Sequence, residues 1–459
     1  VLCNCLWRAG ISKNTLQFVP CSGSDTGDKL TGHPDVDFII FTGGTDTGLH
    51  ILKERPDVFM AGETGGKNAT IVTAMSDRDL AISNIMHSAF SNSGQKCSAT
   101  SLLILEQEVY GNEKFKRQLV DAAASYPVGS QWDFKNRMGP LIRPPRDDLK
   151  NALNSLQPGE SWALKPKMID NNPYMWTPGI KWGVRPGSYT HMTEFFGPLL
   201  SVMKAKNIEE AIDLVNQTGY GLTSGLESLD KREQEFWKDK IRAGNLYISR
   251  VTTGAVVLRQ PFGGMGKSAL GAGIKVGHFN YVTQFMNFEE IKEPKTGPIE
   301  NDSPLWRTAR ELNRKIYWRQ FDDIRDDLQK TARAIKSYLF NAEREFLREK
   351  DYFRLRGQDN IIRYLPIGKV VIRIHEKDSL FETLARIAAA RISGCRVIIS
   401  IPPKLENRVT AFLGETWGQR IVGDSGILRQ TDPLLTEMIP AIDRIRSEER
   451  RVGKECATG

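Results

Sequence analysis

The stretch Val36-Asp-Phe-Ile-Ile-Phe-Thr-Gly-Gly-Thr-Asp-Thr-Gly48 decides the fold of this chain. Its apolar run over 36–41 predicts a buried strand, and a helical pattern follows over 49–55. Ahead of it, 16–20 has the residue types of another strand, and 25–30 suits a turn or a short helix. Because strand, helix and strand in this order are typical of a parallel sheet, we predict an α/β fold.

The turn between this strand and its helix contains Gly43, Gly44, Thr45 and Gly48. Glycine lets a backbone approach a ligand closely, and the free N–H groups at the start of a helix favour an anion. The turn could therefore hold a pyrophosphate. The same glycines could also serve the geometry of the turn alone, and both interpretations stay open.

Composition narrows the class of protein. The 459 residues suffice for two or three domains. The 63 basic and 55 acidic residues include no basic run interleaved with aromatics, so we do not expect nucleic acid as a partner. No apolar stretch is long enough to span a membrane, and residues 1–8 lack the basic region and cleavage site of a signal peptide, so we expect a cytoplasmic protein. No second pair follows Cys3 and Cys5 at zinc-ligand spacing, so we expect no metal site.

One cysteine lies in a polar loop between a predicted helix and a predicted strand. The helix is expected to begin at a cap near Ser76, with Leu80 among its inward-facing residues, and the strand to cover 102–106. In the loop, Cys97 follows Lys96, a cation that could lower the thiol pKa as a nucleophile requires. An inert, half-buried cysteine is the alternative.

One carboxylate could work with this thiol, and a second could bind a cofactor. No histidine lies in a motif for a Cys–His pair, so a papain-type hydrolase is unsupported. Glu63, in a glycine-rich segment, could activate water after the thiol has formed a covalent adduct, or could be a surface turn acid. Further along, Glu194 could accept ribose hydroxyls and Phe196 could stack on a nicotinamide. A turn acid and a core phenylalanine are the alternatives for these two.

These motifs, in this order, resemble the aldehyde dehydrogenase family, whose pattern runs FTGxTxxG, ExGGK, GQxC, ExFGP, GYGL, GNxxxN and PFGGxxxSG. The resemblance implies that family's fold, here a partial Rossmann-like NAD domain with an α/β catalytic domain. It implies Cys97 as the nucleophile and Glu63 as the base that activates water. It also implies NAD as the cofactor, bound by Gly43, Gly44, Thr45, Gly48, Glu194 and Phe196.

The segment 242–264 looks like the 1-pyrroline-5-carboxylate (glutamate γ-semialdehyde) dehydrogenases, especially those of bifunctional proline utilization A. This resemblance implies NAD-dependent oxidation of glutamate γ-semialdehyde to glutamate in proline catabolism. It implies that Ser98, Gly254 and Ala255 hold the substrate's α-carboxylate, and a hydroxyl with the N–H groups of a glycine loop suits an anion. Ser249 departs from the Asn that the family usually has at that position.

Two alternatives stay open: an aldehyde dehydrogenase for a different aldehyde, and a truncated, catalytically silent scaffold. Because Val1 is not Met, we expect a fragment of a longer protein. The resemblance implies that an oxyanion-stabilising Asn and a ribose-contacting Lys precede it. It also implies a homo-oligomer and an upstream proline dehydrogenase domain that would carry FAD.

The last third of the chain has a different pattern. A charged helical region over 305–350 precedes a strand at 368–374, a helix at 379–392 and a strand at 395–400. This part resembles the C-terminal domain of long proline utilization A enzymes, which is aldehyde-dehydrogenase-like without catalytic residues. We expect a structural role, with an independent ligand site as the alternative. We predict the C-terminal part of an NAD-binding domain at 1–66, a catalytic domain at 67–265, a return segment at 266–292, a linker at 293–304, a helical region and α/β domain at 305–440, and a disordered or artefactual tail at 441–459.

Overall fold

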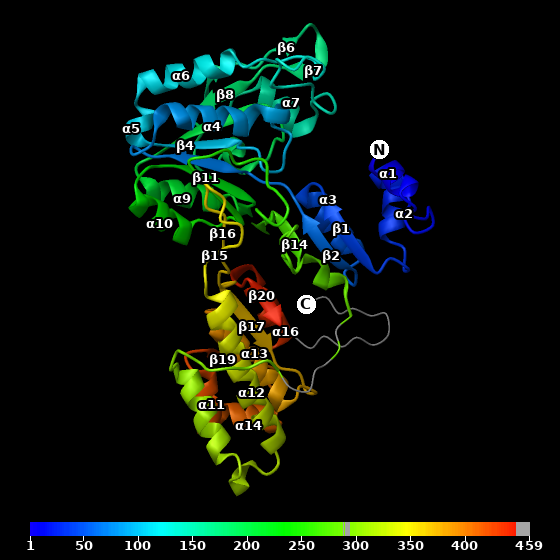
Figure 1. Ribbon diagram of the computed structural model, residues 1–459, viewed down its shortest axis with the longest axis vertical. Coiled ribbons are helices and arrows are strands. Elements are labelled where there is room, and N and C mark those ends of the chain that lie inside the picture. The colour runs from blue at the N-terminus through cyan, green and yellow to red at the C-terminus, as the bar shows by residue number, and fades with distance from the viewer. Residues whose placement is uncertain (288, 290–293, 447–459) are drawn as a thin grey trace. The chain divides into compact units, whose positions relative to one another are not determined.

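The computed structural model describes residues 1–287, 289 and 294–446 (Figure 1). The chain forms two compact units, Val1–Gln284 and Phe285–Gly459. Each unit combines a parallel sheet with helices, which confirms the predicted α/β class. The finer domain boundaries stay predictions. Within the described residues, no helix is both long and apolar enough to cross a membrane.

The first unit contains a small sheet with the order β1-β2-β14. β1 (Phe38–Thr42) and β2 (Phe59–Glu63) are parallel, and α3 (Thr45–Glu54) joins them, as the sequence predicts. β14 (Ala269–Gly271) returns from far along the chain and pairs antiparallel with β2. This arrangement puts Glu63 at the carboxyl end of the central strand.

Two predictions for this region were wrong. β1 is the outer strand of its sheet, and Ile40 is 61% exposed, so the strand is not buried. Residues 16–20 form no strand. Pro20 has no N–H to give to a ladder, and the residue types of a strand do not by themselves supply a pairing partner.

A second sheet in this unit has the order β12-β11-β3-β4-β9-β8-β5, and all its neighbours are parallel except β5 with β8. Figure 1 shows α4 and α6 over one face and α9 and α10 over the other, each pair with its own apolar core. Burial on both faces explains why the central strands are apolar runs rather than alternating ones. The strands are β3 (Ala69–Val72), β4 (Leu102–Glu106), β5 (Ser161–Leu164), β8 (Gly179–Trp182), β9 (Leu199–Ala205), β11 (Thr223–Glu227) and β12 (Asn245–Ile248).

Helix α4 (Arg78–Phe90) leads into the loop that contains Cys97. The carboxylate of Asp77 caps it by accepting the N–H groups of Asp79 and Leu80, one residue later than the expected cap. The helix itself is confirmed. Leu80, however, is 41% exposed, because it lies outside the buried stripe that includes Ile85.

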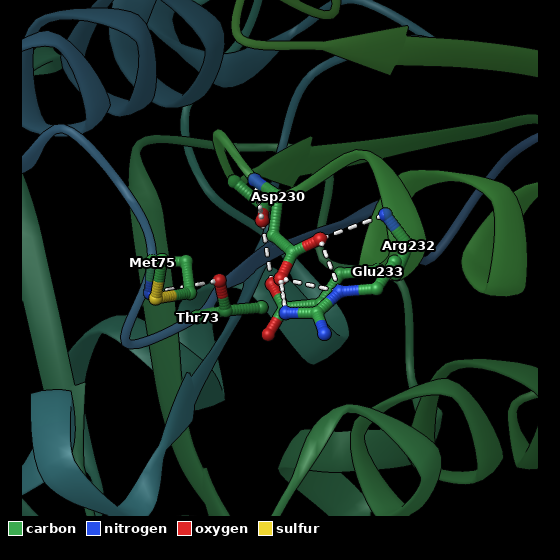
Figure 2. Close-up of polar contacts among 6 residues, drawn as sticks. Thr73, Met75, Asp230, Arg232 and Glu233 are labelled. Atoms are coloured by element: carbon green, nitrogen blue, oxygen red, sulfur yellow. Dashed lines mark hydrogen bonds and ion pairs between the residues drawn. The ribbon is translucent and has the colours of Figure 1, made fainter.

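The carboxyl ends of β3 and β11 are closed by the polar contacts of Figure 2. Asp230 caps α10 (Lys231–Lys240) by accepting the N–H of Arg232 at 2.8 Å, and it pairs with the same residue's guanidinium at 2.6 Å. After β3, the N–H of Met75 donates to the hydroxyl of Thr73 at 3.3 Å. The loop with Cys97 comes before β4, so it lies at the opposite, amino ends of these strands.

The second unit has a parallel sheet with the order β19-β18-β17-β20. β17 (Lys369–Arg373), α13 (Leu380–Ile392) and β18 (Arg396–Ile401) form the predicted strand–helix–strand unit. β20 (Arg444–Arg446) pairs with β17, so the tail prediction for 441–459 was wrong in its first part. Residues 447–459 lie outside the described part of the chain.

The remaining elements complete the description. In the first unit these are α1 (Leu2–Arg8), η1 (Gly23–Gly27), α2 (Asp28–Thr31), η2 (Ser91–Gly94), α5 (Gln107–Tyr110), α6 (Glu113–Ala124), α7 (Asp147–Asn154), β6 (Met168–Ile169), β7 (Asn172–Trp176), α8 (Tyr189–Met192), α9 (Ile208–Gln217), β10 (Tyr220–Gly221), β13 (Met265–Gly266) and η3 (Tyr281–Phe285, which ends in the second unit). In the second unit they are α11 (Pro304–Lys315), η4 (Arg319–Phe321), α12 (Arg325–Asn341), η5 (Ala342–Phe346), β15 (Lys350–Asp351), β16 (Ile361–Ile362), α14 (Arg408–Gly414), α15 (Thr416–Val422), β19 (Gly426–Arg429), α16 (Asp432–Met438) and η6 (Ile439–Ala441).

Candidate active site

The loop that carries Cys97 turns sharply at its start. Gly94 has a φ of +66°, and a Cβ there would overlap the carbonyl of Gly197. Only glycine combines this backbone conformation with so close an approach. The amide of Gln95 then donates to the carbonyl of Phe196 at 3.3 Å. The loop before β4 is thereby fixed against the segment that contains Glu194 and Phe196.

Cys97 is half-buried and forms no disulfide. Burial raises the pKa of its thiol, and the negative charge of Glu63 raises it further, while the backbone N–H of Ser98 opposes the shift. The lowering that Lys96 suggested in the sequence was wrong, because desolvation and the charge of Glu63 outweigh any effect of this half-buried neighbour. The thiol is therefore protonated at neutral pH and requires a base to become a nucleophile.

Glu63 supplies a carboxyl group close to this thiol. Burial raises the pKa of Glu63 to about 7, against the opposing charge of Lys275 and a hydrogen bond from the N–H of Gly264. Its Oε2 is buried and has no hydrogen-bond partner among the described residues. A carboxyl group that titrates near neutral pH with a free oxygen can accept a proton from a thiol or from water.

Lys275 was missed by the sequence analysis. Its ammonium donates to the carbonyl of Gly244, to Oδ1 of Asn245 at 3.1 Å and to the carbonyl of Gly263 at 3.1 Å. A Cβ on Gly263 would lie 3.1 Å from Oε1 of Glu63 and 3.2 Å from Cα of Lys275, so these two residues flank one glycine. A lone lysine in a glycine-rich stretch is the only signal that the sequence offers for it.

Glu194 lies directly against the turn that follows Glu63. Its Oε1 accepts the N–H of Gly66 at 2.8 Å, and its carboxylate occupies the space that a side chain at Gly65 would need. Burial raises the pKa of Glu194, against the hydrogen bond from Gly66 and the charge of Lys67. Lys67 is 1% exposed, and its ammonium lies 4.5 Å from the centre of the Phe195 ring. The predicted base and the predicted cofactor residues thus share one connected set of contacts.

Phe196 is not a core residue. It is 42% exposed and has a φ of +53°, a conformation that is uncommon for a bulky side chain. Such backbone strain persists where the surrounding structure requires the side chain to be presented. The structure therefore favours the predicted stacking surface over the alternative of core packing.

The four residues of the turn before α3 have different environments. Gly44 precedes the helix with no side-chain cap, and a Cβ there would meet nothing within 4 Å. Thr45 donates its hydroxyl to the carbonyl of Lys267 at 2.9 Å. A Cβ on Gly43 would strike the ring of Phe41, and one on Gly48 would collide with Leu270. Close packing explains Gly43 and Gly48, whereas Gly44 leaves the start of the helix open.

The predicted carboxylate site combines a buried residue with an exposed loop. Ser98 is 6% exposed, while Gly254, with a φ of +91°, and Ala255 are exposed. Between the two, Thr252 donates its hydroxyl to the carbonyl of Ser98 at 3.0 Å. Ser249 has a φ of +50°, which Asn adopts more readily than Ser, so the Ser at this position is expected to strain the backbone more than the Asn that the family usually has.

The structure brings most of the predicted site residues together. The charges of Glu63 and Glu194 both raise the pKa of the Cys97 thiol. Cys97 in turn lies close enough to Tyr247 to raise the pKa of its hydroxyl. Ser98 links this group to the loop at 252–255. Tyr247, like Lys275, was not singled out in the sequence, because a tyrosine within a strand has no distinguishing pattern.

Comparison with known proteins places these residues in a family. The model of the aldehyde dehydrogenase family matches residues 1–291. The 1-pyrroline-5-carboxylate dehydrogenase of Geobacillus sp. (strain WCH70) is 32% identical over 303 residues, which cover 63% of this chain and 57% of that protein. The enzyme of that name from Bacillus subtilis (strain 168) is 31% identical, covering 62% of this chain and 56% of its own length. The chain therefore spans little more than half the length of these relatives.

Solved structures show the same relationship. Proline utilization A from Corynebacterium freiburgense matches 94% of this chain and 43% of its own, with a TM-score of 0.77 and 34% identity. The 1-pyrroline-5-carboxylate dehydrogenase from Thermus, solved with bound NAD, matches 61% of this chain and 55% of its own, with a TM-score of 0.55 and 32% identity. The first of these likenesses extends over both units.

Proposed function

This chain belongs to the aldehyde dehydrogenase family, and we propose on that premise that it oxidises L-glutamate γ-semialdehyde to L-glutamate with NAD. One observation carries the proposal. A half-buried thiol, Cys97, lies beside a carboxyl group, Glu63, whose pKa is raised to about 7, and next to an open glycine loop that suits a second carboxylate. The names of the relatives support this choice of substrate.

The chemistry begins with a proton transfer from the Cys97 thiol to the Glu63 carboxylate. The thiolate then adds to the aldehyde carbon, and the backbone N–H of Cys97 can stabilise the oxygen that becomes negative. When bound, NAD would accept the hydride that converts this adduct into a thioester on Cys97. Glu63, once its proton has left to solvent, deprotonates a water that attacks the thioester, releasing the new carboxylate and restoring the thiolate.

The residues present fit a dinucleotide. The start of α3 offers free N–H groups and an open position at Gly44, as a pyrophosphate requires. Among the described residues, the carboxylate of Glu194 accepts one hydrogen bond, from Gly66, and so retains capacity for ribose hydroxyls. Phe196 offers an exposed ring for the nicotinamide. Gly43, Thr45 and Gly48 would support this site through the shape of the turn.

Recognition of the substrate's α-carboxylate would come from Ser98, Gly254 and Ala255. The φ of Gly254 turns the backbone so that successive N–H groups can face an anion, and nothing lies within 4 Å of its Cβ position. Ser98 directly follows Cys97 in the chain and is buried, so its side chain is held close to the nucleophile. The distance between the aldehyde carbon and the α-carboxylate of glutamate γ-semialdehyde would then select this substrate.

Further partners are part of the proposal. The likeness to proline utilization A supports a proline dehydrogenase domain in the same protein, which would hold FAD and supply the aldehyde precursor. A homo-oligomer remains a prediction from the resemblance, and a cytoplasmic location remains a prediction from the sequence composition. For the second unit we propose a structural role rather than a ligand site of its own.

The test is NADH formation by the full-length gene product, with glutamate γ-semialdehyde and with propanal, an aldehyde that has no carboxylate. We expect turnover of both, with a KM for glutamate γ-semialdehyde that rises about tenfold in Ser98→Ala while that for propanal does not. Turnover of propanal alone would identify a dehydrogenase for a different aldehyde. A folded protein without turnover of either would support the catalytically silent scaffold.

A further inference from the structure

The carbonyl groups of residues 97–99 all point into a buried polar network. The amide of Asn68 donates to the carbonyl of Cys97 at 2.6 Å and to that of Ala99 at 3.0 Å. Thr252 and Thr223 donate their hydroxyls to the carbonyl of Ser98, at 3.0 and 3.3 Å. Because all three carbonyls accept hydrogen bonds from the protein interior, the opposite side of this segment can face a substrate.

Behind Thr252 lies a row of three buried hydroxyls. Thr252 and Thr100 are 3.2 Å apart between their Oγ1 atoms, and Thr100 and Thr70 are 3.0 Å apart. All three residues are at most 3% exposed. The row leads from the strands of the large sheet to the beginning of the glycine loop.

The direction of hydrogen-bond donation along this row follows from the carbonyl at its end. The carbonyl of Ser98 can only accept, so Thr252 must donate to it. The single hydroxyl proton of Thr252 is then used, so Thr100 donates to Thr252 and Thr70 donates to Thr100. Donation along a chain strengthens each bond in it. The end of the chain is therefore the point at which Ser98 is fixed.

The backbone of Thr252 is held by a hydrogen bond as well as its hydroxyl. Its N–H donates to the hydroxyl of Ser88 in α4 at 3.0 Å. A Cβ on Gly225 would lie 2.9 Å from Oγ1 of Thr70 and 3.1 Å from Cγ2 of Thr252, so these two side chains fill the space beside a glycine strand residue. The residue just before the exposed turn at Gly254 is thus held by helix and sheet together.

We propose that Thr252 is a positioning residue that sets selectivity for the substrate's α-carboxylate, by holding Ser98 and the loop with Gly254 in one fixed relation. This inference rests on the proposed function. Thr252 itself touches no substrate: it is buried, and its hydroxyl points to the protein. The nucleophile is held separately by Asn68, so loss of the Thr252 bond should affect recognition of the anion more than chemistry at Cys97.

The test compares Thr252→Val, which keeps the size and removes the hydroxyl, with Thr252→Ser, which keeps the hydroxyl. In the full-length gene product, we expect Thr252→Val to raise the KM for glutamate γ-semialdehyde about tenfold. Its kcat, and the KM for propanal, should change less than about twofold, and Thr252→Ser should restore the wild-type KM. Equal rises in KM for both aldehydes, or no rise for either, would overturn the proposal.

A second measurement needs no turnover. Glutamate that occupies the site should slow alkylation of Cys97 by iodoacetamide, followed by mass spectrometry. We expect protection in the wild type and in Thr252→Ser, and weaker protection in Thr252→Val. Thr383→Val is the matched control, since Thr383 is a fully buried residue of the second unit whose hydroxyl has no partner among the described residues. Equal protection in all variants would overturn the inference, whereas no protection in the wild type would count against the proposed function.

Discussion

Both units contain two parallel strands joined by a helix, but the two helices begin differently. α3 follows Gly44 with no side-chain cap. α13 follows Ser379, whose hydroxyl accepts the N–H of Glu382 while the Glu382 carboxylate accepts the N–H of Ser379. The start of α3 is open to an external anion, and the start of α13 is closed by the protein's own carboxylate.

The turn before α13 is closed by a second acid as well. Asp378 is 7% exposed, accepts the N–H of His375 at 2.7 Å and pairs with Arg386 at 3.0 Å. In the first unit, the equivalent position before the helix is Gly44, which has no side chain to cap it, and the one acid in the first turn of α3 is Asp46. If the turn before α3 holds a pyrophosphate as proposed, one connection of strand, helix and strand serves as an anion site in the first unit and as a structural support in the second, depending on a few residues of the turn. The comparison favours a structural role for the second unit.

Each unit also has a free, half-buried cysteine, Cys97 in the first and Cys395 in the second. Replacing each of them should give the largest difference in kcat. Cys97→Ala should lower kcat by roughly 10⁴-fold or more, since it removes the nucleophile. Cys395→Ala, at the turn after α13, should leave kcat unchanged. NADH formation by both variants checks this. Retained turnover in Cys97→Ala would contradict the mechanism.

Glu63 provides the next contrast, this time between two carboxyl groups of the first unit, Glu63 in β2 and Glu227 in β11, which belong to different sheets. We expect kcat to rise as the pH increases through about 7, because Glu63 acts as a base only when deprotonated and its pKa is about 7. Glu63→Gln should lower kcat about 10²- to 10⁴-fold. The measurement is the pH dependence of kcat for both proteins.

The control for this prediction is Glu227, at the carboxyl end of β11. Burial raises its pKa to about 7 as well, against a hydrogen bond from Asn84. Because it lies at the other end of the strands from Cys97, Glu227→Gln should leave the pH profile unchanged. An altered profile in Glu227→Gln, with an unaltered one in Glu63→Gln, would assign the titration to Glu227 and contradict the prediction.

Local pattern predicted most of the elements near the site. The strand at 102–106 was predicted with the observed bounds, because an apolar run buried on both faces leaves little ambiguity. The strand expected at 16–20 failed, since pairing depends on a partner far along the chain. The helix that contains Leu80 was predicted, but its cap is Asp77, one residue after the expected position, and Leu80 itself is exposed although Ile85 is buried. The sheet that covers a helix is also non-local, so local pattern does not settle every inward-facing position.

The site residues divide in the same way. Cys97, Glu63 and Glu194 lie in recognisable short motifs, whereas Lys275 and Thr252 act through contacts that join distant segments. The pKa of the Cys97 thiol was predicted in the wrong direction, because Lys96 is adjacent in sequence while burial and Glu63 dominate in space. Sequence motifs identify groups that react, and the fold determines the charges around them.

Gly44→Asp would make the start of α3 resemble that of α13. Gly44 has an extended backbone and open space at its Cβ position, so the substitution should fold without strain. The new carboxylate would compete with an anion for the free N–H groups, and we expect the KM for NAD to rise roughly fivefold to tenfold. Gly44→Ser, a neutral cap, should raise it less. An unchanged KM for NAD in Gly44→Asp would show that the turn does not hold the pyrophosphate.

The smallest effect is expected from opening the start of α13. Ser379→Ala removes one half of the capping box and should lower the free energy of unfolding by about 1 kcal/mol, with no change in kcat. Thr431→Ala is the matched control in the same unit, because Thr431 precedes α16 without accepting a cap hydrogen bond. Its effect should stay within about 0.5 kcal/mol. Urea unfolding measures both, and equal losses of stability would mean that the side-chain cap does not stabilise α13, which would remove the physical basis for contrasting the two helices.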